Sequence, residues 1–173
     1  MELWDIYGID REKTGETMER GAAFSDGAHH MGAHICVFNS EGKMLIQKRQ
    51  PHKSGYGGRW DLSAGGSSLA GENSQETAHR ELFEEIGIDH DFTGVRPHLT
   101  INRPNIFDDI YLVIKDVDLS ALTLQEGEVE RVMWADADMI VSLIEKDEFV
   151  PYYPELIRLL FVMKERYGSY CKK

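Results

Sequence analysis

Three glutamates and one arginine share a short segment near the middle of the chain: Arg80, Glu81, Glu84 and Glu85. The segment, residues 66–88 with the sequence GSSLAGENSQETAHRELFEEIGI, is predicted to be a glycine-rich loop followed by a helix. Because an α-helix turns about 100° per residue, the four charged side chains project over an arc of about 140°. The apolar Leu82, Phe83 and Ile86 project from the opposite side, between about 200° and 300°. The pattern therefore predicts a helix with one core face and one carboxylate face.

This carboxylate face is unfavourable without a counter-charge. Glu81 and Glu85 form a like-charge pair four residues apart, which costs about 0.2–0.5 kcal/mol on an isolated helix. Glu84 and Glu85 also lie just before Gly87, where the negative end of the helix dipole disfavours anions. A divalent cation would reverse both effects, and oxygen ligands without His or Cys suit Mg²⁺ or Mn²⁺. We therefore interpret the three glutamates as candidate ligands of a hard metal ion, against the alternative of a solvated charged face.

The fixed residues of this segment fit the motif of a known family: Gly66, Glu72, Arg80, Glu81, Leu82, Glu84, Glu85, Gly87 and Ile88. Their spacing is Gly, five residues, Glu, seven residues, Arg-Glu-aliphatic, one residue, Glu-Glu, one residue, Gly-aliphatic, and it resembles the Nudix box at every fixed position. The resemblance implies an α/β protein with the Nudix fold, an α/β/α sandwich around a mixed β-sheet. It also implies a Mg²⁺- or Mn²⁺-dependent hydrolase that cleaves a diphosphate linkage in a nucleoside diphosphate derivative or a similar small molecule.

The resemblance also implies roles for individual residues. Three of them take the family's metal-ligand role: Glu81, Glu84 and Glu85. Glu84 and Arg80 are the candidate catalytic residues of the helix, and Arg80 has the orienting role. Glu72 is an auxiliary acid that binds the metal or orients its ligands. Gly65 and Gly66 let the backbone approach the metal and the phosphates.

Residues outside the box are further candidates. Glu128, at a predicted junction of loop and strand, is a candidate general base, against the alternative of a solvated loop acid beside Glu126 and Glu130. Lys48 and Arg49 follow an apolar strand and point to opposite faces, so one of them is expected to reach a phosphate. The sequence does not choose between these two.

Other residues are weaker candidates. Tyr56, in the polar loop PHKSGYGGRW, is a candidate for stacking on a base. The candidate metal ligands are His29, His30 and His34, and the candidate auxiliary acids are Asp108 and Asp109. For these histidines and aspartates an ordinary structural role is the favoured alternative.

The wider chain is similar to the Nudix branch that includes type I isopentenyl-diphosphate isomerase, in segments such as HHMGAHICVFN and GRWDLSAGG. An isomerase is therefore one alternative function, and a non-catalytic Nudix ligand-binding module is another. The isomerases carry a catalytic cysteine and a metal-binding histidine before the box, and the matching positions here hold Gly65 and Ser67. His30 matches a further isomerase histidine, but one histidine does not restore that chemistry. The sequence therefore favours hydrolysis.

The surrounding elements alternate in a way that predicts a mixed sheet between helices. In chain order they are an N-terminal hairpin extension at 1–31 with strands at 2–9 and 17–24, a hairpin at 33–49, the box helix, strands at 92–102, 106–115 and 128–136, and helices at 137–146 and 153–168. The box helix is expected to begin near Asn73 or Ser74, both good N-cap residues, and to end at Gly87.

The composition predicts one globular domain over residues 1–173. The net charge of −11 argues against a broad nucleic-acid surface and against an anionic membrane, because both need clustered cations. The two cysteines, Cys36 and Cys171, do not suggest a disulfide framework. No apolar run reaches about 18 residues and the first ten residues lack a signal-peptide pattern, so the chain is predicted to be cytoplasmic. The expected partner is a small phosphorylated substrate, and the resemblance permits a homodimer.

Overall fold

The computed structural model describes residues 2–168 and 170, so Cys171 and both ends of the predicted 1–173 domain lie outside the described residues. The strands are β1 (Leu3–Tyr7), β2 (Lys13–Glu19), β3 (His30–Phe38), β4 (Met44–Arg49), β5 (Trp60–Asp61), β6 (Ala64–Ser67), β7 (Leu99–Arg103), β8 (Ile106–Ile114) and β9 (Val129–Ala135). The helices are α1 (Ser74–Ile86), α2 (Ala137–Glu145) and α3 (Pro154–Met163), with a short 3₁₀-helix at Leu119–Ala121. None of these helices combines the length and the apolar character that a membrane crossing would need.

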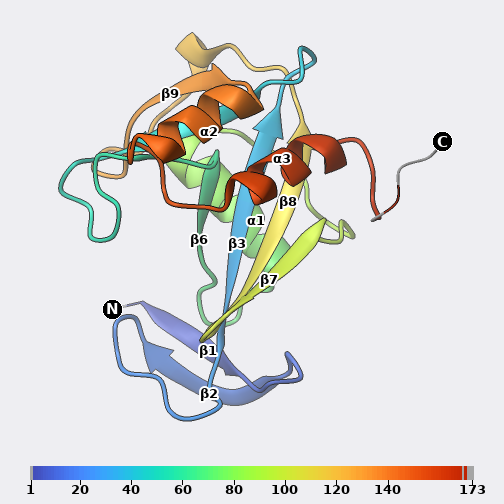
Figure 1. The fold of residues 1–173 in the computed structure, drawn as a ribbon. Helices are drawn as coiled ribbons and strands as arrows, with labels where there is room; N and C mark the ends of the chain where they lie inside the picture. Colours follow the sequence, from blue (N-terminus) through green and yellow to red (C-terminus); the bar gives the residue numbers. More distant parts are fainter. Residues whose placement is uncertain (1, 169, 171–173) are drawn as a thin grey trace.

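The larger sheet is mixed and is centred on β3 (Figure 1). One edge of β3 runs parallel to β8 over its full length. The other edge pairs antiparallel with β6 between Gly32 and Ile35, and meets β4 only through Phe38 and Met44. The predicted hairpin at 33–49 is therefore present in chain order, but its two strands part after a single residue pair because β6 occupies the same edge. β5 and β9 extend the sheet beyond β4, and β7 extends it beyond β8.

Helix α1 covers one face of this sheet. Its apolar residues Leu82 and Ile86 pack against Ile35 and Val37, which alternate with the residues of the other face along β3. The contacts of α1 are mainly with β3 and β6. The box helix is therefore seated directly over the two strands that meet at the centre of the sheet.

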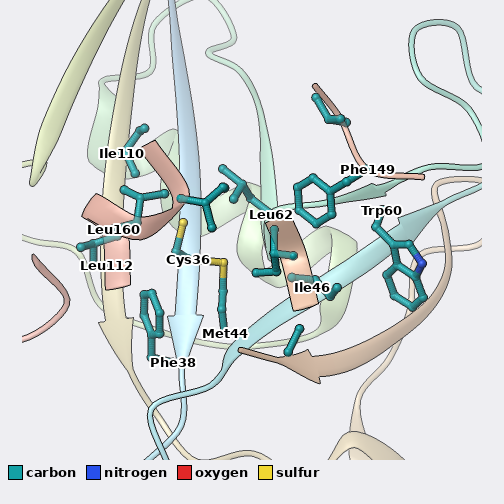
Figure 2. Close-up of a cluster of buried hydrophobic side chains, with 14 of the residues drawn as sticks. Cys36, Phe38, Met44, Ile46, Trp60, Leu62, Ile110, Leu112, Phe149 and Leu160 are labelled. Atoms are coloured by element: carbon teal, nitrogen blue, oxygen red, sulfur yellow. The ribbon is translucent and has the colours of Figure 1, made fainter. Parts of the chain in front are cut away.

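Helices α2 and α3 cover the opposite face (Figure 1), and Figure 2 shows buried side chains of the core there. Cys36 and Phe38 of β3 belong to this core, together with Ile140 of α2 and Ile157 and Leu160 of α3. All five side chains are fully buried. Helices on both faces of a mixed sheet confirm the predicted α/β/α sandwich.

The N-terminal hairpin forms a separate two-stranded sheet of β1 and β2 (Figure 1). Its second strand begins at Lys13, not at residue 17 as predicted, because the turn closes between Gly8 and Glu12 with Arg11 at a φ of 65°. From this turn Arg11 reaches Asp109 on β8, at 2.9 and 3.1 Å from its two carboxylate oxygens. The hairpin is thus fastened to the main sheet by an ion pair between residues far apart in the chain.

Two other predicted elements are shorter in the structure. The strand predicted at 92–102 is limited to Leu99–Arg103, because Phe92 turns into the α1 core and Gly94 has a φ of 75°. The helix predicted at 153–168 ends at Met163. The division of the chain into one domain with these subregions stays a prediction.

The hairpin attachment can be tested with Arg11→Ala. Asp109 is only 2% exposed, and without Arg11 its carboxylate would keep only the Thr100 hydroxyl as a partner among the described residues. Removing one partner of a buried ion pair is costly, although Arg11 itself is partly exposed, so we expect the free energy of unfolding to fall by about 1–3 kcal/mol. Urea unfolding would measure this change. Arg158→Ala is the control, because the Arg158–Asp138 pair is exposed and should contribute less than about 1 kcal/mol; an equal loss in both variants would contradict the attachment.

Candidate functional site

The helix that carries the carboxylates has a complete cap at each end. The side chain of Asn73 accepts hydrogen bonds from the backbone N–H groups of Gln75 and Glu76, and Glu76 accepts one from the backbone N–H of Asn73. This capping box settles the start of the helix, which the sequence alone left open between Asn73 and Ser74. Gly87 ends the helix in the left-handed conformation, with a φ of 72°, as predicted.

The two faces of α1 differ from the helical-wheel prediction in one respect. Glu85, assigned to the carboxylate face, is buried with 5% exposure, whereas Phe83, assigned to the core face, is 55% exposed. The buried arc of the helix runs through Ala78, Leu82 and Glu85. The prediction was wrong here because the strands under α1 provide hydrogen-bond donors for the carboxylate of Glu85.

Arg80 is the centre of the charged cluster. Its Nε and Nη2 donate to the two carboxylate oxygens of Glu72, at 2.6 and 3.0 Å. Its Nη1 donates to Glu81 at 2.7 Å and to Glu84 at 3.2 Å, and Nη2 also donates to the carbonyl oxygen of Ser67 at 3.0 Å. These carboxylates hold the pKa of Arg80 above its usual value in spite of its burial. One guanidinium therefore positions three acids and the strand that precedes the loop.

Glu72 is committed to this network. Besides the bidentate contact with Arg80, its Oε2 accepts from the backbone N–H of Leu69 at 2.9 Å and from the hydroxyl of Thr77 at 3.0 Å. Burial alone would raise the pKa of Glu72, but the hydrogen bonds from Arg80 and Leu69 outweigh it and leave the pKa below its usual value. Of the two roles predicted for Glu72, this geometry favours orienting Arg80 over binding a metal ion.

Glu81 and Glu85 lie against the glycine-rich strand β6. A Cβ atom at Gly66 would overlap the carboxylate of Glu81, so a larger residue there would force this carboxylate to move. Glu85 Oε2 accepts hydrogen bonds from the backbone N–H of Gly65 at 3.0 Å and from Gln47 Nε2 at 2.8 Å. The predicted role of these glycines, an approach of the backbone to the metal and the phosphates, stays a prediction, and the hydrogen bond that Gly65 donates to Glu85 was not predicted.

Burial gives both of these carboxyl groups an elevated pKa. For Glu85, burial and then the charge of Glu81 raise the pKa to about 8, although Gly65 and Gln47 partly offset the effect. For Glu81, burial raises the pKa even with Arg80 beside it. A buried and a half-buried carboxyl group that both resist ionisation form an electrostatically unfavourable pair until a cation is added.

A cavity opens beside this pair. Charged residues from four parts of the chain line it: Glu2, Arg20, Arg49, Lys53, Arg80, Glu81, Glu84, Glu85 and Glu128. Glu128 forms an ion pair with Lys53 at the cavity wall. Of the two basic residues that were predicted to alternate on β4, Arg49 faces the cavity, and Lys48 is not among its described lining residues. Gly65 and Gly66 complete the wall.

The sequence did not point to several of these groups. Gln47 of β4 donates a hydrogen bond to Glu85. Alternation along β4 places Gln47 on the opposite face from Met44 and Ile46, but the sequence does not show which of these faces meets α1. Glu2 and Arg20 come from the N-terminal hairpin, where they form an ion pair at 2.7 Å. Lys53 lies in a polar loop without any periodic signal.

The donor set of the cavity fits a hard divalent cation by chemistry. Glu81, Glu84 and Glu85 offer only oxygen donors, and Glu85 Oε1 accepts no hydrogen bond from the described residues. Within residues 2–168 and 170, however, no three acidic, histidine or cysteine side chains are already arranged as a metal-binding group. Arg80 Nη1 occupies oxygens of Glu81 and Glu84 instead. These contacts use Glu81 Oε1 and Glu84 Oε2 and leave the other oxygen of each carboxylate for a cation.

Comparison with known proteins gives the same family for most of the chain. Residues 28–160 match the family model described as the NUDIX domain. Over 164 residues the chain is 43% identical to an uncharacterized Nudix hydrolase of Listeria monocytogenes, covering 95% of this chain and 96% of that protein. It is also 32% identical over 89 residues to the isopentenyl-diphosphate Delta-isomerase of Pectobacterium atrosepticum, covering 51% of this chain and 50% of the isomerase.

Solved structures share the fold. A crystal structure from Deinococcus radiodurans aligns with a TM-score of 0.75 at 22% identity, over 92% of this chain and 99% of that one. A bifunctional NMN adenylyltransferase/ADP ribose pyrophosphatase from Francisella tularensis, complexed with AMP and a Mn ion, aligns with a TM-score of 0.61 at 18% identity. That alignment covers 82% of this chain and 43% of the bifunctional protein. At these identities the two structures support the fold alone.

The elevated pKa of Glu85 predicts how stability depends on pH. The folded protein keeps this proton up to about pH 8, whereas the unfolded chain loses it near the usual pKa of 4.5. The protonated Glu85 therefore contributes to the free energy of unfolding at low pH, and this contribution is lost as the pH rises from about 4.5 to about 8. In metal-free buffer, we expect the free energy of unfolding of the wild-type protein to fall over this interval by on the order of a few kcal/mol more than that of Glu85→Gln.

Urea unfolding at pH values from about 5 to about 8.5 would measure this difference. Glu165→Gln is a matched control, because Glu165 is an exposed acid beyond α3. Its curve should follow the wild-type curve. Parallel wild-type and Glu85→Gln curves would contradict the assignment of a buried, protonated Glu85.

Proposed function

The chain belongs to the Nudix hydrolase family, and from that premise we propose that it is a Mg²⁺- or Mn²⁺-dependent hydrolase of a diphosphate linkage. The substrate would be a nucleoside diphosphate derivative or a similar small phosphorylated molecule. The observation that carries this proposal is the pair of the half-buried Glu81 and the buried Glu85 at the cavity wall, whose carboxyl groups both have raised pKa values. Such a pair destabilises the folded protein when no cation is bound, and its oxygen atoms are suited to binding a hard cation.

Glu81, Glu84 and Glu85 would hold the cation. When bound, it would neutralise developing charge on the phosphate oxygens and lower the pKa of a coordinated water. Arg80 is the positioning residue: anchored on Glu72 by two hydrogen bonds, it keeps Glu81 and Glu84 turned toward the cavity.

The remaining cavity residues suit a polyanionic substrate. Arg49 faces the cavity and would bind a phosphate oxygen, which a guanidinium can contact through two N–H groups. Glu128 is proposed as the general base, and its ion pair with Lys53 holds it at the cavity wall where an attacking water would lie. The backbone of Gly65 and Gly66 would lie beside the phosphates.

An isomerase is the second candidate, because half of the chain is similar to isopentenyl-diphosphate Delta-isomerase. We favour hydrolysis for two reasons. Gly65 and Ser67 stand at the positions where the resemblance expects cysteine and histidine. The cysteine that the structure describes, Cys36, is fully buried in the core under α2 and α3, where burial raises the pKa of its thiol. A cytoplasmic location and a homodimer stay predictions.

Glutamine substitutions in the box test the cation-binding role. Glu84→Gln and Glu85→Gln each remove a charged oxygen donor with little change in shape, so we expect turnover to fall by at least about a hundredfold while the protein stays folded. Turnover in Mg²⁺ and in Mn²⁺, together with circular dichroism, would measure both effects. Glu165→Gln should retain wild-type activity. Normal hydrolysis by both box variants would refute the assignment.

A substrate panel tests the reaction class. It would contain nucleoside diphosphate sugars, nucleoside triphosphates, dinucleoside polyphosphates and isopentenyl diphosphate, each with Mg²⁺ and with Mn²⁺. We expect phosphate-containing hydrolysis products from at least one nucleotide and no allylic product from isopentenyl diphosphate. Formation of the allylic product would establish the isomerase instead, and no turnover on the whole panel would favour a ligand-binding module.

A further inference from the structure

The N-terminal hairpin of β1 and β2 contacts the loop that precedes α1. The carbonyl oxygen of Leu3 accepts a hydrogen bond from the backbone N–H of Ala70 at 2.7 Å. The carboxylate of Asp5, also on β1, accepts one from the backbone N–H of Gly71 at 2.8 Å. The hairpin lies outside residues 28–160, which match the family model, so that match gives it no role in the site.

Lys13, at the start of β2, joins the hairpin to the same loop at a third point. Its ammonium group lies 2.7 Å from Asp5 Oδ2 and donates a hydrogen bond to the carbonyl oxygen of Glu72 at 3.0 Å. Burial would raise the pKa of Asp5, but the hydrogen bonds from Lys13 and Gly71 outweigh it and leave the pKa below its usual value. Asp5 and Lys13 therefore form an ion pair that holds backbone groups of two consecutive loop residues.

The loop that the hairpin holds also orients the side chain of Glu72. The backbone N–H of Glu72 donates to the carbonyl oxygen of Leu69 at 3.0 Å, and the backbone N–H of Leu69 donates to Glu72 Oε2 at 2.9 Å. The oriented carboxylate then accepts two hydrogen bonds from Arg80. A continuous series of short contacts therefore leads from the hairpin to the guanidinium that holds Glu81 and Glu84.

We propose that Asp5 and Lys13 are positioning residues of the hydrolase site. From the hairpin they hold the loop at residues 69–72, and through Glu72 they fix the orientation of Arg80. Neither side chain is among the described lining residues of the cavity, so both act through other residues and not on the substrate. This inference rests on the proposed hydrolysis of a diphosphate linkage.

The alternative is that these contacts only attach the hairpin to the rest of the protein, and Arg11 separates the two cases. Arg11 fastens the turn of the same hairpin to Asp109 on β8. None of the side-chain contacts described for Arg11 involves the loop at residues 69–72. If attachment were the whole effect, loss of Arg11 and loss of Lys13 would disturb the site alike.

NMR can follow the orientation of Arg80 in protein without metal or substrate. Arg80 Nε donates to Glu72 Oε1 at 2.6 Å, so this N–H should exchange slowly with water and give a separate signal in proton–nitrogen spectra. We expect Lys13→Met to shift this signal and to speed its exchange about tenfold, the effect of weakening one hydrogen bond of ordinary net strength. Lys13→Arg should restore slow exchange because it keeps a cationic donor. Arg11→Ala should leave the signal unchanged.

Steady-state kinetics give a second readout, on the compound of the panel that the wild type hydrolyses fastest. We expect Lys13→Met and Asp5→Ala each to lower kcat about tenfold with a change in KM below about twofold, because they displace the acids of α1 and leave the substrate contacts in place. Glu16→Gln, at an exposed acid on β2, is the control and should keep both wild-type values. Circular dichroism would identify any variant that fails to fold, and Lys13→Met is expected to fold because Lys13 is 39% exposed.

The outcomes separate this inference from the proposed function. Unchanged exchange of the Arg80 Nε–H in folded Lys13→Met and Asp5→Ala would overturn the inference, whatever the turnover of these variants. An equal change in Arg11→Ala would also overturn it, because attachment of the hairpin would then account for the whole effect. Faster exchange in Lys13→Met, restored in Lys13→Arg, would support the positioning of Arg80 even if the wild type hydrolysed no compound of the panel, and only the proposed hydrolysis would then fail.

Discussion

The contact between Arg80 and Glu72 is the interaction on which the arrangement of the site depends. It uses Nε and Nη2 of the guanidinium and leaves Nη1 to hold Glu81 and Glu84. Without that anchor, Glu81 and Glu84 would repel each other and rotate toward solvent. Glu85 depends on a separate support from Gln47 and the backbone of Gly65, which is why it is buried while Glu84 remains half exposed.

The strand beneath this network also accounts for how the sheet is paired. Gly66 of β6 lies against the carboxylate of Glu81 and leaves room for it in its present position. Because β6 lies on the edge of β3, β4 contacts β3 only at Phe38 and Met44 and then diverges. Arg49, at the end of β4, lines the cavity beside the carboxylates of α1.

The sequence was sufficient for features that depend on neighbouring residues. The box spacing, the cap at Gly87 and the layers of the sandwich all follow from local patterns. It was insufficient where a partner lies far away in the chain: a helical wheel cannot show that Gln47 and Gly65 will accept Glu85 into the core. Alternation places Lys48 and Arg49 on opposite faces, but which face meets the cavity depends on the pairing of β4 with β9 and β5. The hairpin contact of Arg11 with Asp109 spans 98 residues and has no local signal.

The charges around the cavity show how a strongly acidic protein can hold a polyanion. The chain as a whole carries a net charge of −11, yet five glutamates and four basic side chains line this cavity. With all of them ionised the local charge is −1, but burial raises the pKa of Glu85 to about 8, so near pH 7 without a cation the protonated Glu85 leaves a local charge of 0. A divalent cation that ionised Glu85 would change it to +1, so the proposed cation would make the cavity attract a diphosphate, while the basic residues would set its position. An acidic surface beyond the cavity then disfavours larger polyanions, which is consistent with a small phosphorylated substrate.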